Sequence, residues 1–432
     1  MFNFNLSVKI YRSIVKQYDV KIFTDNIENT ALEQIQQLLS IDVFRKSKIR
    51  IMPDVHAGAG CVIGFTGNLG DKVIPNIVGV DIGCGILVQP LTLKHNIDYH
   101  AFNEYILHAI PSGRDFRTDN HMPLPQSYMD CYRETKELIL QLRCYRELKE
   151  QKRLYKSIGS LGGGNHFIEL DHDGQGNLYL VVHTGSRNLG KQVADIYQKL
   201  AIKCQSGWDK LIAEQNRIIE EYKQSGRKSE LQEVIRDLHN SFKMRKPSIP
   251  NDLCYLEGMF REDYLHDMRL CQRWAQINRR MIVDLLLDYL INHDYISKRQ
   301  ENEAFESIHN YIDDDNLIRK GAISARLGER CVIPLNMRDG SLICVGKGNK
   351  DWNLSAPHGA GRMLSRSQAF KELSLDEFKR SMNGIYSETI TQATLDESPM
   401  VYKSAKEIMR NIQETVNVEN IIKPIFNFKA TE

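Results

Sequence analysis

A carboxylate and a thiol stand three residues apart in the segment 78–85, which reads Val-Gly-Val-Asp-Ile-Gly-Cys-Gly. Gly83 and Gly85 flank Cys84, so we expect a buried strand to end here in a tight turn. Asp81 and Cys84 could then point into one small volume, where a metal cation would compensate two negative charges. The alternative is that Cys84 is a small core residue and that Asp81 caps the turn.

Three histidines stand where apolar segments meet polar or glycine-rich turns. His166 follows three glycines, His183 ends the largely apolar run 178–182, and His309 follows an expected helix. Histidine at the end of an apolar strand is a common metal ligand, although it is also common as a hydrogen-bonded core residue. These residues form no short-range zinc motif, so their spacing indicates a metal enzyme and leaves its reaction open.

Two further loops combine histidine with glycine. Residues 53–60, which follow an expected strand over 48–52, contain Asp54 and His56. Such a loop can bring backbone close to a ligand, but an ordinary turn is the simpler interpretation. His358 is followed by Gly359, Ala360 and Gly361, and then by an expected helix. The small residues leave room for a bulky group on the imidazole, and a helix start offers N–H donors to phosphate.

The basic residues are concentrated late in the chain. The whole chain of 432 residues has a formal net charge of +2, whereas residues 319–366 carry nine Lys or Arg and three acids. The overall charge therefore indicates neither nucleic acid nor a membrane surface as a partner. The local excess suits phosphate groups, with a solvated surface as the alternative.

Composition places the chain among soluble globular proteins. Hydrophobic residues make up 42% and charged residues 26% of the chain. No apolar run approaches the roughly 20 residues of a membrane helix. The nine cysteines show no paired framework, and the N-terminal 17 residues lack a signal-peptide pattern. We therefore expect reduced thiols and a cytoplasmic location.

The periodicity of apolar residues predicts both strands and helices. Strands are expected over residues 8–24 and 48–52, and helices over 29–39, 97–110, 127–155 and 259–294. Residues 207–250 are charged and mostly helical with a bend at 225–227, and we interpret them as a helical hairpin inserted in one domain that spans residues 1–432. No clear domain boundary or internal repeat is visible.

Taken together, the motifs resemble those of the RtcB-type RNA ligases. The matching segments run in family order from near residue 50 to the end of the chain: Pro-Asp-Val-His (53–56), Val-Asp-Ile-Gly-Cys-Gly (80–85), Gly-Gly-Gly-Asn-His-Phe (162–167), His-Thr-Gly-Ser-Arg (183–187), Asn-Arg (278–279), His-Asn (309–310), His-Gly-Ala-Gly-Arg (358–362), Asp-Glu-Ser-Pro (396–399), Tyr-Lys (402–403) and Lys429. The resemblance implies an α+β fold in which central β-sheets surround a metal centre, with peripheral helices and a charged helical insertion.

The resemblance also implies a reaction. Enzymes of this family use GTP and Mn²⁺, two ions per active site, to join RNA ending in a 2′,3′-cyclic phosphate or 3′-phosphate to RNA with a 5′-hydroxyl. A histidine attacks GTP and holds GMP, which then passes to the RNA 3′-phosphate and is displaced by the 5′-hydroxyl. Such enzymes act in RNA repair or tRNA splicing, and an activating protein partner is a further expectation.

Residue roles follow from the same resemblance. His358 would be the nucleophile, and Cys84 would bridge two metals, one completed by His166 and His183 and the other by Asp81 and His309. Arg187 and Arg362 would lie near RNA. The nucleotide would be surrounded by Asn165, Phe167, Ile168, Glu169, Asn310, Pro334, Leu335, Asn336, Met337, Ser341, Gly359, Ala360, Gly361 and Lys429.

Three residues depart from the family pattern. Leu335 and Asn336 replace Gly and Ser of a Pro-Gly-Ser-Met segment, and Ala430 replaces a Gly. The ligand types are also softer than Mn²⁺ usually prefers, because Cys and His ordinarily favour zinc. A metal-dependent phosphodiesterase or RNA 3′-end processing enzyme without ligation is the alternative function, and an RNA-binding protein without catalysis is a third.

Overall fold

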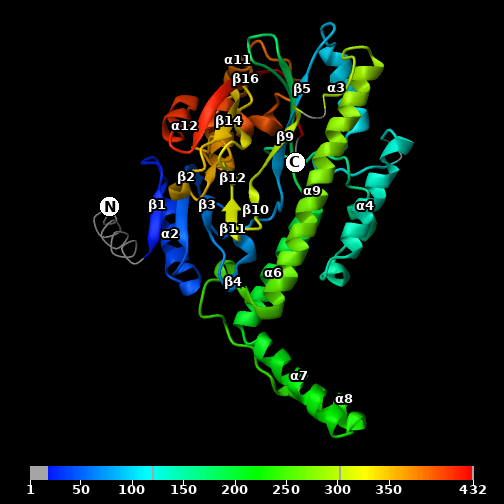
Figure 1. Ribbon diagram of the computed structural model, residues 1–432, viewed down its shortest axis with the longest axis vertical. Coiled ribbons are helices and arrows are strands. Elements are labelled where there is room, and N and C mark those ends of the chain that lie inside the picture. The colour runs from blue at the N-terminus through cyan, green and yellow to red at the C-terminus, as the bar shows by residue number, and fades with distance from the viewer. Residues whose placement is uncertain (1–17, 119–120, 301–302, 431–432) are drawn as a thin grey trace.

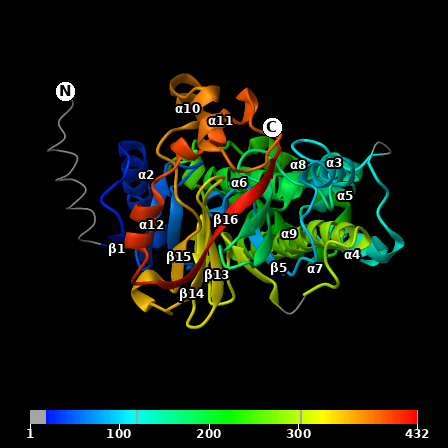
Figure 2. The ribbon, with the colours of Figure 1, turned by 90° about the horizontal axis from the view of Figure 1, so that it is seen from above.

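A seven-stranded sheet forms the centre of the protein. The computed structural model describes residues 18–118, 121–300 and 303–430, and the part of the expected strand over 8–17 lies outside these residues. Neighbouring strands of this sheet are antiparallel, and the order β13-β14-β16-β6-β7-β5-β9 corresponds to Arg330–Asn336, Gly340–Gly346, Val416–Lys429, Phe167–His172, Leu178–Thr184, Gly85–Leu91 and Phe305–Ile308. Figure 2 shows β16 crossing the middle of the molecule.

A five-stranded sheet lies beside it. Its order β1-β2-β3-β11-β10 corresponds to Asp19–Ile22, Lys48–His56, Ile63–Asn68, Leu317–Lys320 and Asn310–Ile312. The backbone joins the two sheets directly, because β9 of the first sheet is followed after one residue, His309, by β10 of the second. Two short ladders pair β12 (Ala322–Ser324) with β15 (Ser355–Pro357) and β4 (Lys72–Val73) with β8 (Leu256–Glu257).

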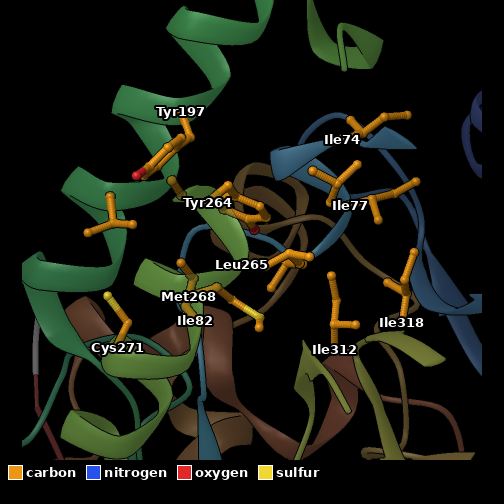
Figure 3. Close-up of a cluster of buried hydrophobic side chains, with 14 of the residues drawn as sticks. Ile74, Ile77, Ile82, Tyr197, Tyr264, Leu265, Met268, Cys271, Ile312 and Ile318 are labelled. Carbon is orange, nitrogen blue, oxygen red and sulfur yellow. The ribbon is translucent and has the colours of Figure 1, made fainter. Parts of the chain in front are cut away.

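The long helix α9 (Gly258–Asn292) packs against both parts of the hydrophobic core. Its first half contributes Tyr264, Leu265, Met268 and Cys271 to one buried cluster, and its second half contributes Leu286 and Leu290 to another. Buried residues occur on most of its circumference, as expected for a helix enclosed by other elements. Figure 3 shows the first cluster, in which α9 side chains meet Tyr197, Ile77, Ile82, Ile312 and Ile318 from four other segments.

The remaining helices lie around the sheets. Figure 1 shows α3 (Tyr99–Ala109) and α4 (Met129–Leu140) beside α9, and it shows α7 (Trp208–Gln224) and α8 (Leu231–Ser241) extending from the body below α6 (Arg187–Gln205). The other α-helices of the described residues are α2 (Asn29–Leu39), α5 (Gln151–Tyr155), α10 (Arg366–Glu372), α11 (Leu375–Ser381) and α12 (Ala405–Asn411).

Three local predictions are wrong. No strand ends at Asp81, because residues 78–84 lie in turns and the strand β5 begins only at Gly85. His309 follows the strand β9 and not a helix, and the strand expected over 48–52 continues to His56, so that Asp54 lies in β2 and not in a loop.

Most helix predictions are confirmed, with one correction. The helix predicted over 29–39 is α2, and that predicted over 259–294 is α9. The single helix predicted over 127–155 is wrong, because the chain leaves α4 after Leu140 and resumes helical structure only in short pieces. The break is stabilised by Asp267 of α9, whose carboxylate accepts hydrogen bonds from the backbone N–H groups of Arg143 and Cys144.

Within residues 18–118, 121–300 and 303–430, none of the helices combines the length and the apolar character that crossing a bilayer requires.

Candidate active site

Four predicted ligands meet at one edge of the seven-stranded sheet. Cys84 precedes β5, His166 precedes β6, His183 lies near the end of β7, and His309 follows β9. The order β6-β7-β5-β9 places these strands side by side, and Phe167 and Ile86 both pair with His183. In an antiparallel sheet, the starts of β5 and β6 lie at the same edge as the ends of β7 and β9. Sheet topology therefore gathers side chains that are up to 225 residues apart.

The donor atoms form two groups that share Cys84. One group is Asp81, Cys84 and His166, the other is Cys84, His183 and His309, and within each group the donor atoms lie within 4.8 Å of one another. Sγ of Cys84 lies 3.3 Å from Nε2 of both His166 and His183, and Nε2 of His166 lies 3.0 Å from Oδ2 of Asp81. This grouping differs from the expected one, which combined His166 with His183 and Asp81 with His309.

The protonation chemistry of these groups suits cation binding. Burial, together with neighbouring positive groups, lowers the pKa of His183 and of His309 well below the ordinary value, so both imidazoles are neutral. Nδ1 of His183 donates to the backbone O of Asn165 at 3.0 Å, which leaves Nε2 with its lone pair toward Cys84. Nδ1 of His309 is buried and has no hydrogen-bond partner among the described residues. A thiol, a carboxylate and three imidazoles in these positions fit one or two divalent transition-metal ions.

Two glycines pack directly against the ligands. A Cβ atom at Gly162 would lie 1.7 Å from Nδ1 of His166, and one at Gly185 would lie 2.2 Å from Oδ1 of Asp81. Any side chain at either position would displace a ligand. These glycines therefore have a steric role that the sequence pattern alone did not reveal.

Asn278 and Arg279 of α9 support the same loops from behind. The Asn278 side chain accepts from the backbone N–H of Gly159 at 2.8 Å and donates to the backbone O of Gly185 at 3.3 Å. The buried Arg279 guanidinium donates to the backbone O atoms of Gly83 and Thr184 at 2.7 and 2.9 Å. Since Gly83 and Thr184 adjoin Cys84 and His183, Arg279 fixes the backbone of two ligands at once.

His358 lies next to this centre and is oriented by a carboxylate. Its ring centroid is 4.9 Å from that of His309. Its Nδ1 lies 2.6 Å from Oδ2 of Asp54, a residue of β2 whose side chain is fully buried. The Asp54 carboxylate fixes the proton on Nδ1, so Nε2 of His358 carries the lone pair that can attack an electrophile. Sequence reasoning named Asp54 but gave it no role, because an aspartate in a glycine-rich segment is typical of an ordinary turn.

A large cavity contains His358 and most of the predicted nucleotide-binding residues. Its volume is about 940 Å³, which is large enough for a nucleotide, and His183 also lines it. The predicted residues on its wall are Asn165, Phe167, Glu169, Pro334, Leu335, Asn336, Met337, Ser341, Gly359, Ala360, Gly361 and Lys429.

Two predicted residues are not on this wall. Ile168 points to the opposite face of β6, where it packs in the hydrophobic cluster beside α3 and α9. Strand alternation explains this, because its neighbours Phe167 and Glu169 face the cavity. Asn310 instead connects loops, since its Nδ2 donates to the backbone O of Asp81 at 3.1 Å and its Oδ1 accepts from the N–H of Gly321 at 3.0 Å.

The departures at residues 335 and 336 have a local explanation. Oδ1 of Asn336 accepts from the backbone N–H groups of Arg338 and Asp339, and its Nδ2 donates to the Asp339 carboxylate at 2.9 Å. The Asn336 side chain thus stabilises the turn between β13 and β14. Leu335 is 3% exposed and packs in the hydrophobic cluster of that hairpin.

Charged side chains at the cavity wall are paired through Glu397. Lys429 and Arg362 each donate to its carboxylate at 3.0 Å. Although burial acts in the opposite direction, these two cations hold the pKa of Glu397 down at about 2. Arg362, expected near RNA, lies at the same cavity as His358 and also donates to the backbone O of Asp396.

Arg187 lies at a second cavity, of about 770 Å³, on whose wall Asp81 and His166 also lie. Its guanidinium is anchored to Oγ of Ser160 at 3.1 Å and to the backbone O of Gly113 at 2.5 Å. The ligand cluster therefore touches both cavities, the first through His183 and the second through Asp81 and His166. Other cations on the second wall are Arg114, Lys149, Arg153, Lys191 and Lys199.

The basic window 319–366 does not form one phosphate-binding surface. Arg319 is fully buried and paired with Asp313 at 2.7 Å, and Lys320 donates to the backbone O atoms of Ala59 and Asn76. Arg338 pairs with the adjacent Asp339. Counting charges in the window could not reveal the partner of Arg319, because Asp313 lies just outside the window.

Comparison with known proteins gives a consistent result. A family model described as tRNA-splicing ligase RtcB matches residues 34–430. The chain is 30% identical over 435 residues to the RNA-splicing ligase RtcB of Escherichia coli strain K12, an alignment that covers 95% of this chain and 97% of that protein. It is 24% identical over 431 residues to the tRNA-splicing ligase RtcB of Aeropyrum pernix, with 83% of this chain and 82% of that protein covered.

Proposed function

The chain belongs to the RtcB family and is an RNA ligase of that family, and from this premise we propose that it uses GTP to join RNA ends. Its substrates are a 2′,3′-cyclic phosphate or 3′-phosphate end and a 5′-hydroxyl end. The reaction proceeds through GMP attached to His358. The observation that carries the proposal is the contact of Asp54 with Nδ1 of His358, because His358 lies beside the ligand cluster and lines a cavity of nucleotide size.

Two Mn²⁺ ions are proposed for the ligand cluster. Asp81, Cys84 and His166 would hold one, and Cys84, His183 and His309 the other. Bound there, the ions would neutralise phosphate charge and stabilise the oxygen atoms that attack or depart. The family resemblance supports Mn²⁺, whereas the thiol and imidazole donors alone would also suit zinc.

The residues of the first cavity would bind GTP and carry out the first transfer. Nε2 of His358 attacks the α-phosphorus of GTP, a bond to phosphorus forms, and pyrophosphate leaves. Asp54 keeps the proton on Nδ1 and stabilises the positive charge that develops on the imidazole. Glu169 and Lys429 lie on the same wall, where they can bind the guanine base. The main-chain N–H groups of residues 359–361, which line the same cavity, would donate to phosphate oxygens.

RNA is proposed to occupy the second cavity. Its 3′-phosphate would approach Arg187 and the ligands Asp81 and His166. GMP then passes from His358 to this phosphate, and the 5′-hydroxyl displaces GMP to form the new phosphodiester bond. A cyclic phosphate is first hydrolysed to the 3′-phosphate. Arg362, which lines the first cavity, would contact the RNA where the two cavities approach the ligand cluster.

The cellular setting is proposed from the cysteines and the family. All nine cysteines are free thiols, including Cys331 and Cys344, which pair across neighbouring strands. Metal binding by Cys84 requires the reduced thiol, and a cytoplasmic location would keep this thiol reduced. The segment 207–250 is proposed as an insertion in a single domain over residues 1–432, and an activating protein partner remains part of the proposal.

Incubation with radiolabelled GTP and Mn²⁺ tests this function. The wild-type protein should acquire an acid-labile GMP label that His358→Ala abolishes, while His95→Ala, a change at an exposed histidine, should keep it. Addition of RNA with a 3′-phosphate and a 5′-hydroxyl should release the label and yield joined product. Absence of label from wild-type protein with proven metal content would overturn the proposal. Opening of a cyclic phosphate without use of GTP would instead indicate the phosphodiesterase alternative.

A further inference from the structure

Asp171 is a buried acid without a visible partner. It lies on β6, its side chain is fully buried, and neither carboxyl oxygen has a hydrogen-bond partner within the described residues. Burial and the nearby Glu169 raise its pKa well above the ordinary value. A buried carboxyl group in this setting keeps its proton, and it can therefore donate a hydrogen bond at neutral pH.

Asn427 carries a buried amide oxygen to which no hydrogen-bond donor is assigned within the described residues. It lies on β16 directly opposite Glu169, and its side chain is also fully buried. Its Nδ2 donates to Oε1 of Glu169 at 2.6 Å, whereas its Oδ1 is buried without a partner in the described part of the chain. Because an amide can turn by 180° at little cost, some other group must decide which end faces Glu169.

The strand register brings Asp171 within reach of Asn427. Glu169 and Asp171 are two residues apart on β6, so their side chains share one face. Glu169 pairs with Asn427 and Asp171 pairs with Pro424, with a β-bulge between Pro424 and Phe426. Asp171 is therefore a diagonal neighbour of Asn427 across the two strands. Diagonal neighbours on one face of a sheet can touch through their side chains. Asp171 thus offers one donor where Asn427 needs one.

Glu169 connects this pair to the first cavity, whose wall it shares with Lys429. Guanine presents two adjacent donors, N1–H and the N2 amino group, and a carboxylate with a free oxygen matches this edge. Adenine lacks this pair of donors. A correctly oriented and ionised Glu169 would therefore distinguish GTP from ATP.

We propose that Asp171 is a positioning residue for guanine recognition. Its carboxylic acid donates to Oδ1 of Asn427, which directs Nδ2 of Asn427 to Glu169 and leaves Glu169 as the carboxylate that accepts from guanine. This inference rests on the proposed use of GTP. It extends the recognition of the base to a residue that does not touch the nucleotide.

The neighbouring charges define the pH dependence. Burial raises the pKa of Glu169 to about 7, and the Asn427 hydrogen bond and Lys429 act against this effect. GTP affinity should therefore rise as pH increases through about 7. Other groups at or near the same cavity are His183 of β7, His358, and Glu397, which pairs with Lys429, while Tyr179 of β7 lies opposite Asp171. Glu169→Gln separates the titration of Glu169 from theirs.

The test measures binding of the α,β-methylene analogues of GTP and ATP to the full chain with Mn²⁺ between pH 6 and pH 8. Asp171→Leu should weaken binding of the GTP analogue about tenfold and leave binding of the ATP analogue nearly unchanged. It should also move the pH midpoint of GTP-analogue binding upward. Asp171→Asn should restore both the affinity for the GTP analogue and the pH midpoint, because its amide can also donate to Asn427. The thermal midpoint of Asp171→Leu should not fall, because an apolar side chain replaces a buried acid.

Leu170→Val is the matched control. It alters packing on the opposite face of β6 and should change neither selectivity nor the pH midpoint. The inference would be overturned if Asp171→Leu kept the wild-type preference for the GTP analogue and the wild-type pH midpoint. An equal loss of affinity for both analogues would also overturn it. If the wild-type protein binds no GTP analogue, the proposed function itself fails. If wild type binds it and Asp171→Leu binds it equally well, only the role of Asp171 fails.

Discussion

Nδ1 of His358 lies 2.6 Å from the fully buried carboxylate of Asp54, so the nitrogen of His358 that remains for chemistry is Nε2. The two residues are 304 positions apart, and they meet because β15 (Ser355–Pro357), which precedes His358, packs close to β2. The same carboxylate accepts the backbone N–H of His358 at 3.2 Å. Asp54 therefore fixes the position and the tautomer of this imidazole.

The first prediction concerns Asp54. Asp54→Asn should slow formation of the GMP adduct by about 100-fold or more, because an amide neither fixes the tautomer nor stabilises the developing imidazolium charge. Single-turnover labelling with GTP measures this rate. Affinity for a GTP analogue that cannot transfer GMP should stay within about twofold, since Asp54 does not line the cavity. A normal labelling rate would contradict the assigned role.

The second prediction concerns the shared ligand. Cys84→Ala should reduce metal content at both groups, because Cys84 belongs to each of them. His309→Ala should affect one group only and leave about one ion per chain. Metal analysis after gel filtration measures the ratio of metal to protein, with Cys61→Ala, a change at another buried thiol, as the control. Retention of two ions by Cys84→Ala would refute the shared position.

The third prediction uses the glycines that pack on the ligands. Gly185→Ala and Gly162→Ala should fold but lose the ion held by Asp81, Cys84 and His166, because each new methyl group would displace a ligand. Gly70→Ala is a matched control, since a Cβ atom there meets nothing within 4 Å. Metal content and the thermal midpoint of the three variants should separate a local effect from unfolding. Full metal content in both variants would show that the ligands can shift without loss.

The fourth prediction concerns acid stability. The pKa of Glu397 is held at about 2 despite burial, by Lys429 and Arg362, and the ordinary value is near 4.5. The unfolded chain therefore binds the proton first, and the stabilisation from ionised Glu397 is complete above pH 4.5 and is lost as pH falls toward 2. This contribution is on the order of 3 kcal/mol.

Urea unfolding at pH 7, 5 and 4 measures whether the free energy of unfolding falls with pH in this direction. The wild-type protein should lose more stability between pH 5 and pH 4 than Glu397→Gln does, because the variant has no carboxyl group to titrate at this position. Parallel curves for the two proteins would show that the ion pairs with Lys429 and Arg362 add nothing to stability.

Sequence reasoning succeeded where a residue type and its local pattern decide the outcome. Asn29–Leu39 and the long helix near 259–294 follow from apolar periodicity, and the five residues that the motifs predicted as metal ligands lie close together. It failed where a residue far away in the sequence determines where a helix ends or how a charge is paired. Asp267 ends the helix expected over 127–155, and Asp313 neutralises a basic residue from outside the counted window. The division of ligands into two groups depends on strand order, which no short segment contains.

The position of β16 affects when the enzyme can become active. This strand ends at Lys429, yet it lies inside the seven-stranded sheet, between β14 and β6. A chain that stops before residue 416 would leave both neighbouring strands with unpaired edges and would lack Lys429, which lines the first cavity. During synthesis, the sheet can close only after residues 416–429 have left the ribosome. Chains that lack residues 416–429 should therefore be unable to seal RNA.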